Sequence, residues 1–270
     1  MSEQEPRVVA AARSHVGMHR TVNEDSVIAE DPYFLVADGL GGHEAGDLAS
    51  QAAVSVFTEQ LGRPAALSAI EYAIERARAA VLDISRTTSR GAGTTLSGVV
   101  RCEHDGFPCW YVVNVGDSRV YLLRDGAFTQ LTADHSLFAE LEAAGRTEAA
   151  DVPRNVITRA LGAGDSRHDS WLLPMQTGDR ILVCSDGLTN ELTDEELRGV
   201  LTVGGRPESV ADELVQRACE AGGHDNISVV VVDTLFAIEP SPDTGGTDAQ
   251  SWDSSFVDTA DDATRDASGS

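Results

Sequence analysis

Short, continuous apolar runs rich in valine set the strongest limit on the fold of this 270-residue chain. Runs of this kind are typical of strands buried between two layers, because a strand with one solvated face alternates polar and apolar residues. They predict strands at 26–29, 33–37, 94–101, 110–115, 120–123, 180–185 and 226–233. No apolar stretch approaches the roughly 18 residues of a membrane span. The chain is therefore expected to bury its sheets inside a globular domain.

Helical periodicity accompanies these runs. It predicts helices over 44–61, 65–85, 136–144 and 207–221, and a short helix that begins at Thr193, where Thr193 and Glu196 have capping-box spacing. Asp-Gly pairs at 105–106 and 125–126 lie between β-rich runs, a position typical of hairpins. About four helices and ten short strands with hairpins favour antiparallel strands covered by paired helices over βαβ winding.

Charge and composition divide the chain and narrow its partners. The net charge of −24 disfavours nucleic acid and anionic membranes. Residues 239–270 hold eight acidic residues and one arginine. This composition predicts a disordered acidic tail after a single domain over 1–238, with Trp252 and Phe256 either in a featureless tail or in a short docking motif.

Three further sequence features bear on chemistry and location. All 20 basic residues are arginines, which excludes a Walker-type phosphate loop and a Schiff-base lysine. The four cysteines form no CxxC pair, so reduced structural thiols are expected rather than zinc ligands or disulfides. The opening MSEQEPR lacks an apolar signal region, and a cytoplasmic protein is expected.

Aspartates at strand edges are the strongest chemical signal. In YFLVADGLGG and RILVCSDGLT, Asp38 and Asp186 end apolar strands, and the chain then runs on into a loop and a helix. Asp25 and Asp225 directly precede predicted strands, and Asp117 lies between two of them. Aspartate is common at strand ends for turn and capping reasons, and each residue alone fits that structural role. All five together favour a shared site.

Five converging carboxylates need a counter-charge, because like charges raise one another's pKa and cannot all stay ionised. A divalent metal would supply it. Oxygen ligands without an organised His or Cys cluster favour Mg²⁺ or Mn²⁺ over zinc. HEAGD lacks the second histidine of a zinc protease, and GDSRV lacks the pattern of a nucleophile elbow.

Eight segments then resemble, in order, the motifs of the metal-dependent protein phosphatases of the type 2C class, the PPM family. These segments are RTVNED, ADGLGGHEAG, GTTLSG, NVGDSRVY, LTADHS, TRALG, CSDGLT and GGHDNIS. The resemblance implies an α+β fold, a four-layer α-β-β-α sandwich with two central, mostly antiparallel sheets flanked by helices. It also implies a phosphoprotein phosphatase that hydrolyses phosphoserine and phosphothreonine by direct attack of a metal-bridging water.

The same resemblance assigns roles to the aspartates and their neighbours. Asp38 resembles the carboxylate that bridges two Mn²⁺ or Mg²⁺ ions, and Gly39 would offer its carbonyl to one of them. Asp186 and Asp225 look like further ligands of the first ion. Asp25, with Glu24 beside it, looks like the ligand of the second ion, and Asp117 matches a weaker third site.

Three other segments are implied to handle the substrate. Arg20 resembles the arginine that grips the phosphate with its planar fork. Two roles are possible for His43: a general acid that protonates the leaving group, or a structural residue that shapes substrate access or starts the next helix. Asp134, His135, Ser136 and the stretch 137–159 look like the family's mobile flap and its base.

The expected partners are phosphorylated proteins, including the serine/threonine protein kinases that such bacterial phosphatases oppose, and a monomer is expected. Two alternatives stay open at this point. One is a non-catalytic pseudophosphatase that binds phosphoproteins, and the other is a phosphatase dedicated to a single partner.

Overall fold

The computed structural model describes residues 5–41, 45–59, 61, 65–89, 91–153 and 155–238. The predictions for His43 and for the acidic tail 239–270 lie outside these residues. Within the described part of the chain, no helix is long and apolar enough to cross a membrane.

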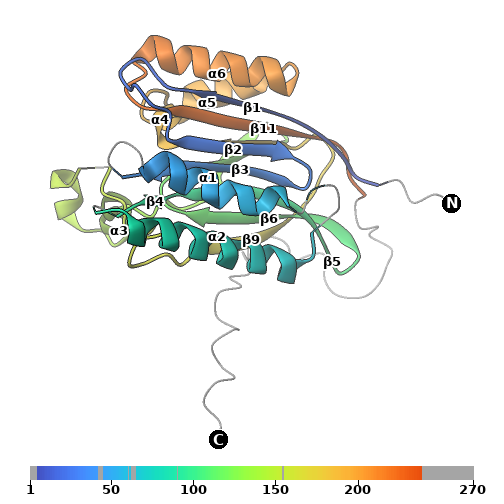
Figure 1. The fold of residues 1–270 in the computed structure, drawn as a ribbon. Helices are drawn as coiled ribbons and strands as arrows, with labels where there is room; N and C mark the ends of the chain where they lie inside the picture. Colours follow the sequence, from blue (N-terminus) through green and yellow to red (C-terminus); the bar gives the residue numbers. More distant parts are fainter. Residues whose placement is uncertain are drawn as a thin grey trace, which may run out of the picture.

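Two antiparallel sheets form the centre of the molecule (Figure 1). The first has the order β1 (Arg7–His15), β11 (Ile227–Phe236), β10 (Arg180–Cys184), β7 (Arg119–Arg124) and β8 (Ala127–Gln130). The second has the order β2 (Asp25–Glu30), β3 (Tyr33–Leu40), β5 (Leu96–His104), β6 (Phe107–Val115) and β9 (Asp169–Pro174), and β4 (Gly93–Thr94) pairs with β3. Sequential strands are joined by hairpins wherever an Asp-Gly pair supplies positive φ angles, as at Asp105-Gly106 and Asp125-Gly126.

Helices cover both outer faces of this pair of sheets. α1 (Ala45–Thr58) contacts β2 and β3, and α2 (Leu67–Thr87) packs on α1 and β5. On the opposite face, α6 (Pro207–Ala221) contacts β1 and β11, and α5 (Asp194–Val203) packs beside α6. Figure 1 shows α5 and α6 on one side of the sheets and α1 and α2 on the other. The predicted four-layer sandwich is confirmed.

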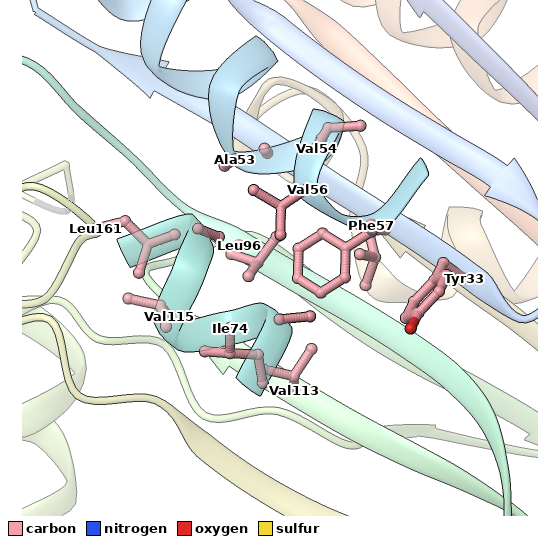
Figure 2. Packing of buried hydrophobic residues seen from close by; sticks show 14 of the residues in the cluster. Tyr33, Ala53, Val54, Val56, Phe57, Ile74, Leu96, Val113, Val115 and Leu161 are labelled. Atoms are coloured by element: carbon pink, nitrogen blue, oxygen red, sulfur yellow. The ribbon is translucent and has the colours of Figure 1, made fainter. Parts of the chain in front are cut away.

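Three apolar clusters hold the four layers together. Phe34, Trp110 and Val230 belong to the cluster between the sheets. Leu182 and Leu214 belong to the cluster under α5 and α6. The third cluster lies under α1 and α2, and Figure 2 shows Phe57 of α1, Tyr33 of β3 and Ile74 of α2 meeting there. The Tyr33 and Phe57 ring centroids are 5.3 Å apart, and both residues are buried. Burial of these large side chains supplies most of the driving force for assembling the sandwich.

Several predicted elements differ from the structure. β1, β8 and β9 lie outside the predicted strand ranges, and the predicted strand 94–101 is split into β4 and β5. α1 ends at Thr58 rather than at residue 61. All four cysteines are free; three of them are buried and Cys219 is half-buried.

The capping box at Thr193 is confirmed and leads to a stability prediction. The Thr193 side chain accepts a hydrogen bond from Glu196 N, and Glu196 Oε2 accepts one from Thr193 N at 2.8 Å. Thr193→Ala is expected to lower the free energy of unfolding by about 1 kcal/mol, because it removes one acceptor from the first turn of α5. Thermal unfolding measures the change. Thr202→Ala, at an exposed position within α5, is the control and should not destabilise the protein; an equal loss in both variants would contradict the capping role.

Candidate metal centre

Asp25 and Asp38 lie opposite each other at one end of the second sheet. They are paired positions in the antiparallel register of β2 and β3, so their backbones are direct neighbours. The Asp38 N–H donates to Thr95 Oγ1 at 2.9 Å, and Ser185 Oγ donates to Asp25 Oδ2 at 2.9 Å. Ser185 directly follows β10, so its hydrogen bond to Asp25 joins the first sheet to the second at this edge.

The other three aspartates come to the same edge from strand ends of the first sheet and from the β6–β7 turn. Asp117 lies in the turn between β6 and β7 and is buried. Asp186 is the first residue of α4 (Asp186–Thr189), directly after β10, and Asp225 lies just before β11. The structure therefore brings together all five aspartates that the sequence analysis selected.

The electrostatics of Asp38 show how closely the carboxylates converge. Burial raises the pKa of Asp38 well above its ordinary value, and the charges of the four other aspartates, Asp25, Asp186, Asp117 and Asp225, raise it further. Such mutual repulsion is the reason that grouped carboxylates need a cation.

The pKa values of three neighbouring aspartates are also raised. Burial raises the pKa of Asp25 to about 7, with added repulsion from Asp186 and Asp225 and opposing hydrogen bonds from Ser228 and Ser185. Burial, with the charge of Asp186, also raises the pKa of Asp117 to about 7. Burial raises the pKa of Asp186 as well, and the charge of Asp225 adds to this.

The donor set fits a hard divalent cation. Asp25 Oδ1 and Asp117 Oδ1 are buried and, within the described part of the chain, have no hydrogen-bond partner. Buried carboxylate oxygens of this kind are costly unless a cation meets them, and an all-oxygen set suits Mg²⁺ or Mn²⁺. Among the described residues, no group of three or more His, Cys, Asp or Glu side chains is arranged so that it could hold a metal ion as it stands. The Asp186 carboxylate also accepts a hydrogen bond from the protein, since Asn190 Nδ2 donates to Asp186 Oδ2 at 3.0 Å.

Gly39 occupies a position where a side chain would not fit. A Cβ atom there would lie 2.3 Å from the Gly46 carbonyl oxygen and 2.5 Å from the Glu24 carbonyl oxygen. The Gly39 N–H donates to that Glu24 oxygen at 3.2 Å. The backbone at Gly39 is therefore held tightly between the loop before β2 and the start of α1.

Arg20 lies at this edge but contacts a carboxylate of the site. Its Nη2 is 2.7 Å from Asp225 Oδ2, and its side chain is half exposed. The sequence analysis assigned Arg20 to a substrate phosphate and did not predict this ion pair.

Two residues that the sequence analysis did not select organise the site. Asn226 Nδ2 donates to the carbonyl oxygens of Val16 and Val22, and its Oδ1 accepts from Glu24 N at 2.8 Å. Ser185 holds Asp25, as described above. Both residues directly neighbour a selected aspartate, Asp225 or Asp186, and that adjacency was the only signal in the sequence.

The predicted base of the flap has three separate connections. Asp134 accepts a bidentate hydrogen bond from Arg119, and Ser136 caps α3 (Leu137–Ala143). His135 Nδ1 accepts from the Gly116 N–H at 3.1 Å, next to Asp117, and its Nε2 lies 3.0 Å from Asp169 Oδ2. These contacts join the segment around α3 to the turn that carries Asp117.

Known proteins resemble this chain over most of its length. Residues 16–225 match the model of the family described as protein phosphatase 2C. The serine/threonine phosphatase stp of Listeria monocytogenes is 36% identical over 216 residues, which cover 75% of this chain and 84% of the relative. The serine/threonine protein phosphatase PstP of Mycobacterium tuberculosis is 37% identical over 235 residues, which cover 83% of this chain and 45% of that longer protein.

Solved structures agree in fold. The crystal structure of Mycobacterium tuberculosis PstP/Ppp has a TM-score of 0.78 and 34% identity, and the match covers 85% of this chain and 99% of that one. The catalytic domain of PstP in complex with two manganese ions has a TM-score of 0.75 and 33% identity, with coverage of 85% and 99%. On the family match, the identities and the shared fold, the chain belongs to the protein phosphatase 2C family.

Proposed function

We propose that this chain hydrolyses phosphoserine and phosphothreonine in proteins at the edge where Asp25, Asp38, Asp117, Asp186 and Asp225 converge. The chain is a metal-dependent serine/threonine protein phosphatase that uses Mn²⁺ or Mg²⁺. The observation that carries the site assignment is the position of Asp38. It is paired with Asp25 in the sheet, and burial and the charges of all four other aspartates raise its pKa. A solved relative, the PstP catalytic domain, carries two manganese ions.

Each aspartate has a proposed place in the metal centre. Asp38 would bridge two ions, with Asp186, Asp225 and the Gly39 carbonyl on the first and Asp25 on the second. Asp117 would serve a weaker third ion. Bound there, the ions would lower the pKa of a shared water that attacks phosphorus and would neutralise the phosphoryl oxygens.

The substrate phosphate is proposed to bind Arg20. The guanidinium fork matches two phosphate oxygens, and its half-exposed position at Asp225 makes it accessible to an incoming phosphoresidue. His43 stays a candidate for the general acid or for a structural role at the start of α1. The segment 137–159 is proposed as a flap that selects substrates.

The test is hydrolysis of a phosphothreonine peptide and of p-nitrophenyl phosphate with Mn²⁺, with Mg²⁺ and with EDTA. Activity should require the metal, disappear in Asp38→Ala and persist in Asp83→Ala, a matched control on the exposed surface of α2. A folded protein that binds phosphopeptides without hydrolysing them under any metal would instead be a pseudophosphatase, an alternative that the named relatives do not favour. Hydrolysis of only one phosphoprotein would favour the dedicated phosphatase.

The wider setting is also a proposal. Residues 1–238 would form the catalytic domain and 239–270 an acidic tail. The enzyme would act as a cytoplasmic monomer in signalling, on phosphorylated proteins that include serine/threonine protein kinases. Its net charge of −24 gives no basis for binding nucleic acid or anionic membranes.

The strong negative charge predicts a preference among substrates. Phosphopeptides with basic flanks should react faster than those with acidic flanks at low salt, because the field of the protein attracts them. The two rates should converge as salt screens the field. Initial rates measured across a salt series check this, and equal rates at low salt would contradict it.

A further inference from the structure

Two histidines form a stacked pair beside the candidate metal centre. The rings of His19 and His224 are parallel, with an interplanar angle of 1° and centroids 4.8 Å apart. Each histidine directly precedes a residue of the site, since Arg20 follows His19 and Asp225 follows His224. The Arg20–Asp225 ion pair, at 2.7 Å, therefore joins the two residues that directly follow the stacked histidines.

The backbone holds the two segments together. Met18 N donates to the Gly223 carbonyl oxygen at 2.7 Å. Gly17 has a φ of +79°, and a Cβ atom there would lie 2.1 Å from the Asp225 carbonyl oxygen. Only glycine allows this close approach. The backbone segments that carry His19 and His224 are thus held together by main-chain contacts as well as by the ring stack.

Glu191 orients the His224 ring. The Glu191 side chain is 8% exposed, and its Oε1 lies 2.7 Å from His224 Nδ1 and accepts from the His224 N–H at 2.9 Å. These hydrogen bonds outweigh burial and lower the pKa of Glu191, so it is a carboxylate and Nδ1 is the donor. The His224 side chain is 71% exposed, so the ring is presented to solvent in a fixed orientation.

The chemistry of this pair suits a planar cation. The stacked imidazoles offer aromatic surface, the Glu191 carboxylate lies at the edge of the His224 ring, and Asp225 directly follows His224 in the chain. Arginine stacks its flat guanidinium on such rings, whereas the compact, strongly hydrated lysine ammonium does so less well. The neighbouring Arg20 would hold the phosphate, so a ligand on the stack would belong to a residue near the phosphorylated one.

We propose that His19 and His224 form a specificity subsite that binds an arginine side chain flanking the phosphoserine or phosphothreonine of the substrate. This inference rests on the proposed function and names a substrate feature for it. It differs from the general attraction of basic peptides to an acidic protein, which salt screens and which treats lysine and arginine alike.

The test uses phosphothreonine peptides that carry Arg, Lys or Gln at one position, scanned over the three residues on each side of the phosphothreonine. In the wild-type protein with Mn²⁺ and high salt, kcat/KM at the best position should favour Arg over Lys by about threefold or more, through KM. In His19→Ala and in His224→Ala the Arg:Lys ratio should fall to about one. His19→Phe should restore the ratio because phenylalanine keeps a flat ring, and His104→Ala, a half-exposed histidine on the β5–β6 hairpin, should keep it.

The possible failures can be told apart. Equal rates on Arg and Lys peptides at high salt, or an unchanged ratio in both alanine variants, would overturn the subsite while leaving the phosphatase intact. If the wild-type protein hydrolyses none of the peptides with Mn²⁺ or Mg²⁺, the proposed function fails and the subsite fails with it. Each variant is judged by the ratio of its kcat/KM values on the Arg and Lys peptides. A general loss of activity lowers both values and leaves this ratio unchanged.

Discussion

Replacing Asp38 by asparagine is expected to lower kcat/KM for a phosphothreonine peptide in Mn²⁺ on the order of 10³-fold and to stabilise the protein in EDTA. Loss of the proposed bridging carboxylate removes charge stabilisation worth several kcal/mol in a metal-assisted reaction, and each 1.4 kcal/mol is about tenfold in rate. The two effects are expected to have opposite signs, because the carboxylate proposed to bind the metal is repelled by the neighbouring aspartates when no metal is bound.

The sign of the stability effect follows from proton binding. Burial and four neighbouring charges raise the pKa of Asp38, so the native state binds this proton more tightly than the unfolded state. A raised carboxyl pKa makes stability fall as pH rises above the unfolded value near 4. Asp25 and Asp117, with pKa values of about 7, extend the loss toward neutral pH. Asparagine at 38 carries no charge, so about 1–2 kcal/mol should be regained at pH 8 in EDTA.

Thermal unfolding in EDTA and in Mn²⁺, from pH 5 to pH 8, measures this. In EDTA the variant should unfold at a higher temperature than the wild type, with the gap widening as pH rises. In Mn²⁺ the wild type should gain stability by ligand binding and the variant should gain less. Asp83→Asn on exposed α2 is the matched control and should follow the wild type in both. A variant that is less stable than the wild type in EDTA would show that Asp38 is not held among repelling charges.

The periodicity of the sequence predicted the longer helices and most of the inner strands, but not the short helix α4. α6 begins at Pro207 and ends at Ala221 as predicted, because Pro at the first turn and Gly222 after the last mark both ends. β1 was not predicted because its run RVVAAARSH is rich in alanine, which has low strand propensity, and lies at a sheet edge where pairing with β11 decides its conformation. β9 is short and ends at Pro174, so only its register with β6 identifies it.

The site was predictable to the extent that strand ends mark it. Asp38 lies near the end of the buried strand β3, Asp186 follows β10 after one residue, and the sandwich brings such ends to one edge. Ser185, however, bonds Asp25 across 160 positions of sequence, and no local pattern indicates that contact. The Arg20–Asp225 ion pair spans 205 positions and was missed for the same reason. Long-range polar contacts depend on the packing of two sheets, which periodicity does not encode.

Arg20 should prove to matter for substrate binding far more than for folding. Its ion pair with Asp225 joins side chains that are 49% and 34% exposed, and such solvent-screened pairs contribute about 0–1 kcal/mol. A charge-assisted hydrogen bond to a phosphate is worth more, roughly 1.5–3 kcal/mol. Arg20→Ala is therefore expected to weaken inhibition by inorganic phosphate, and to raise KM for a phosphopeptide, by about 10- to 100-fold while changing the unfolding temperature little.

Arg20→Lys separates charge from geometry. Lysine keeps the positive charge but cannot hold two phosphate oxygens in a planar fork, so most of the loss in phosphate affinity should remain. Arg13→Lys is the matched control, because Arg13 is a surface arginine of comparable exposure that also pairs with an aspartate, Asp212, away from the five aspartates. Wild-type phosphate inhibition in Arg20→Lys would mean that charge alone suffices at this position. An equal loss in Arg13→Lys would mean that the effect is one of overall charge, and the assignment of Arg20 to the phosphate would then fail.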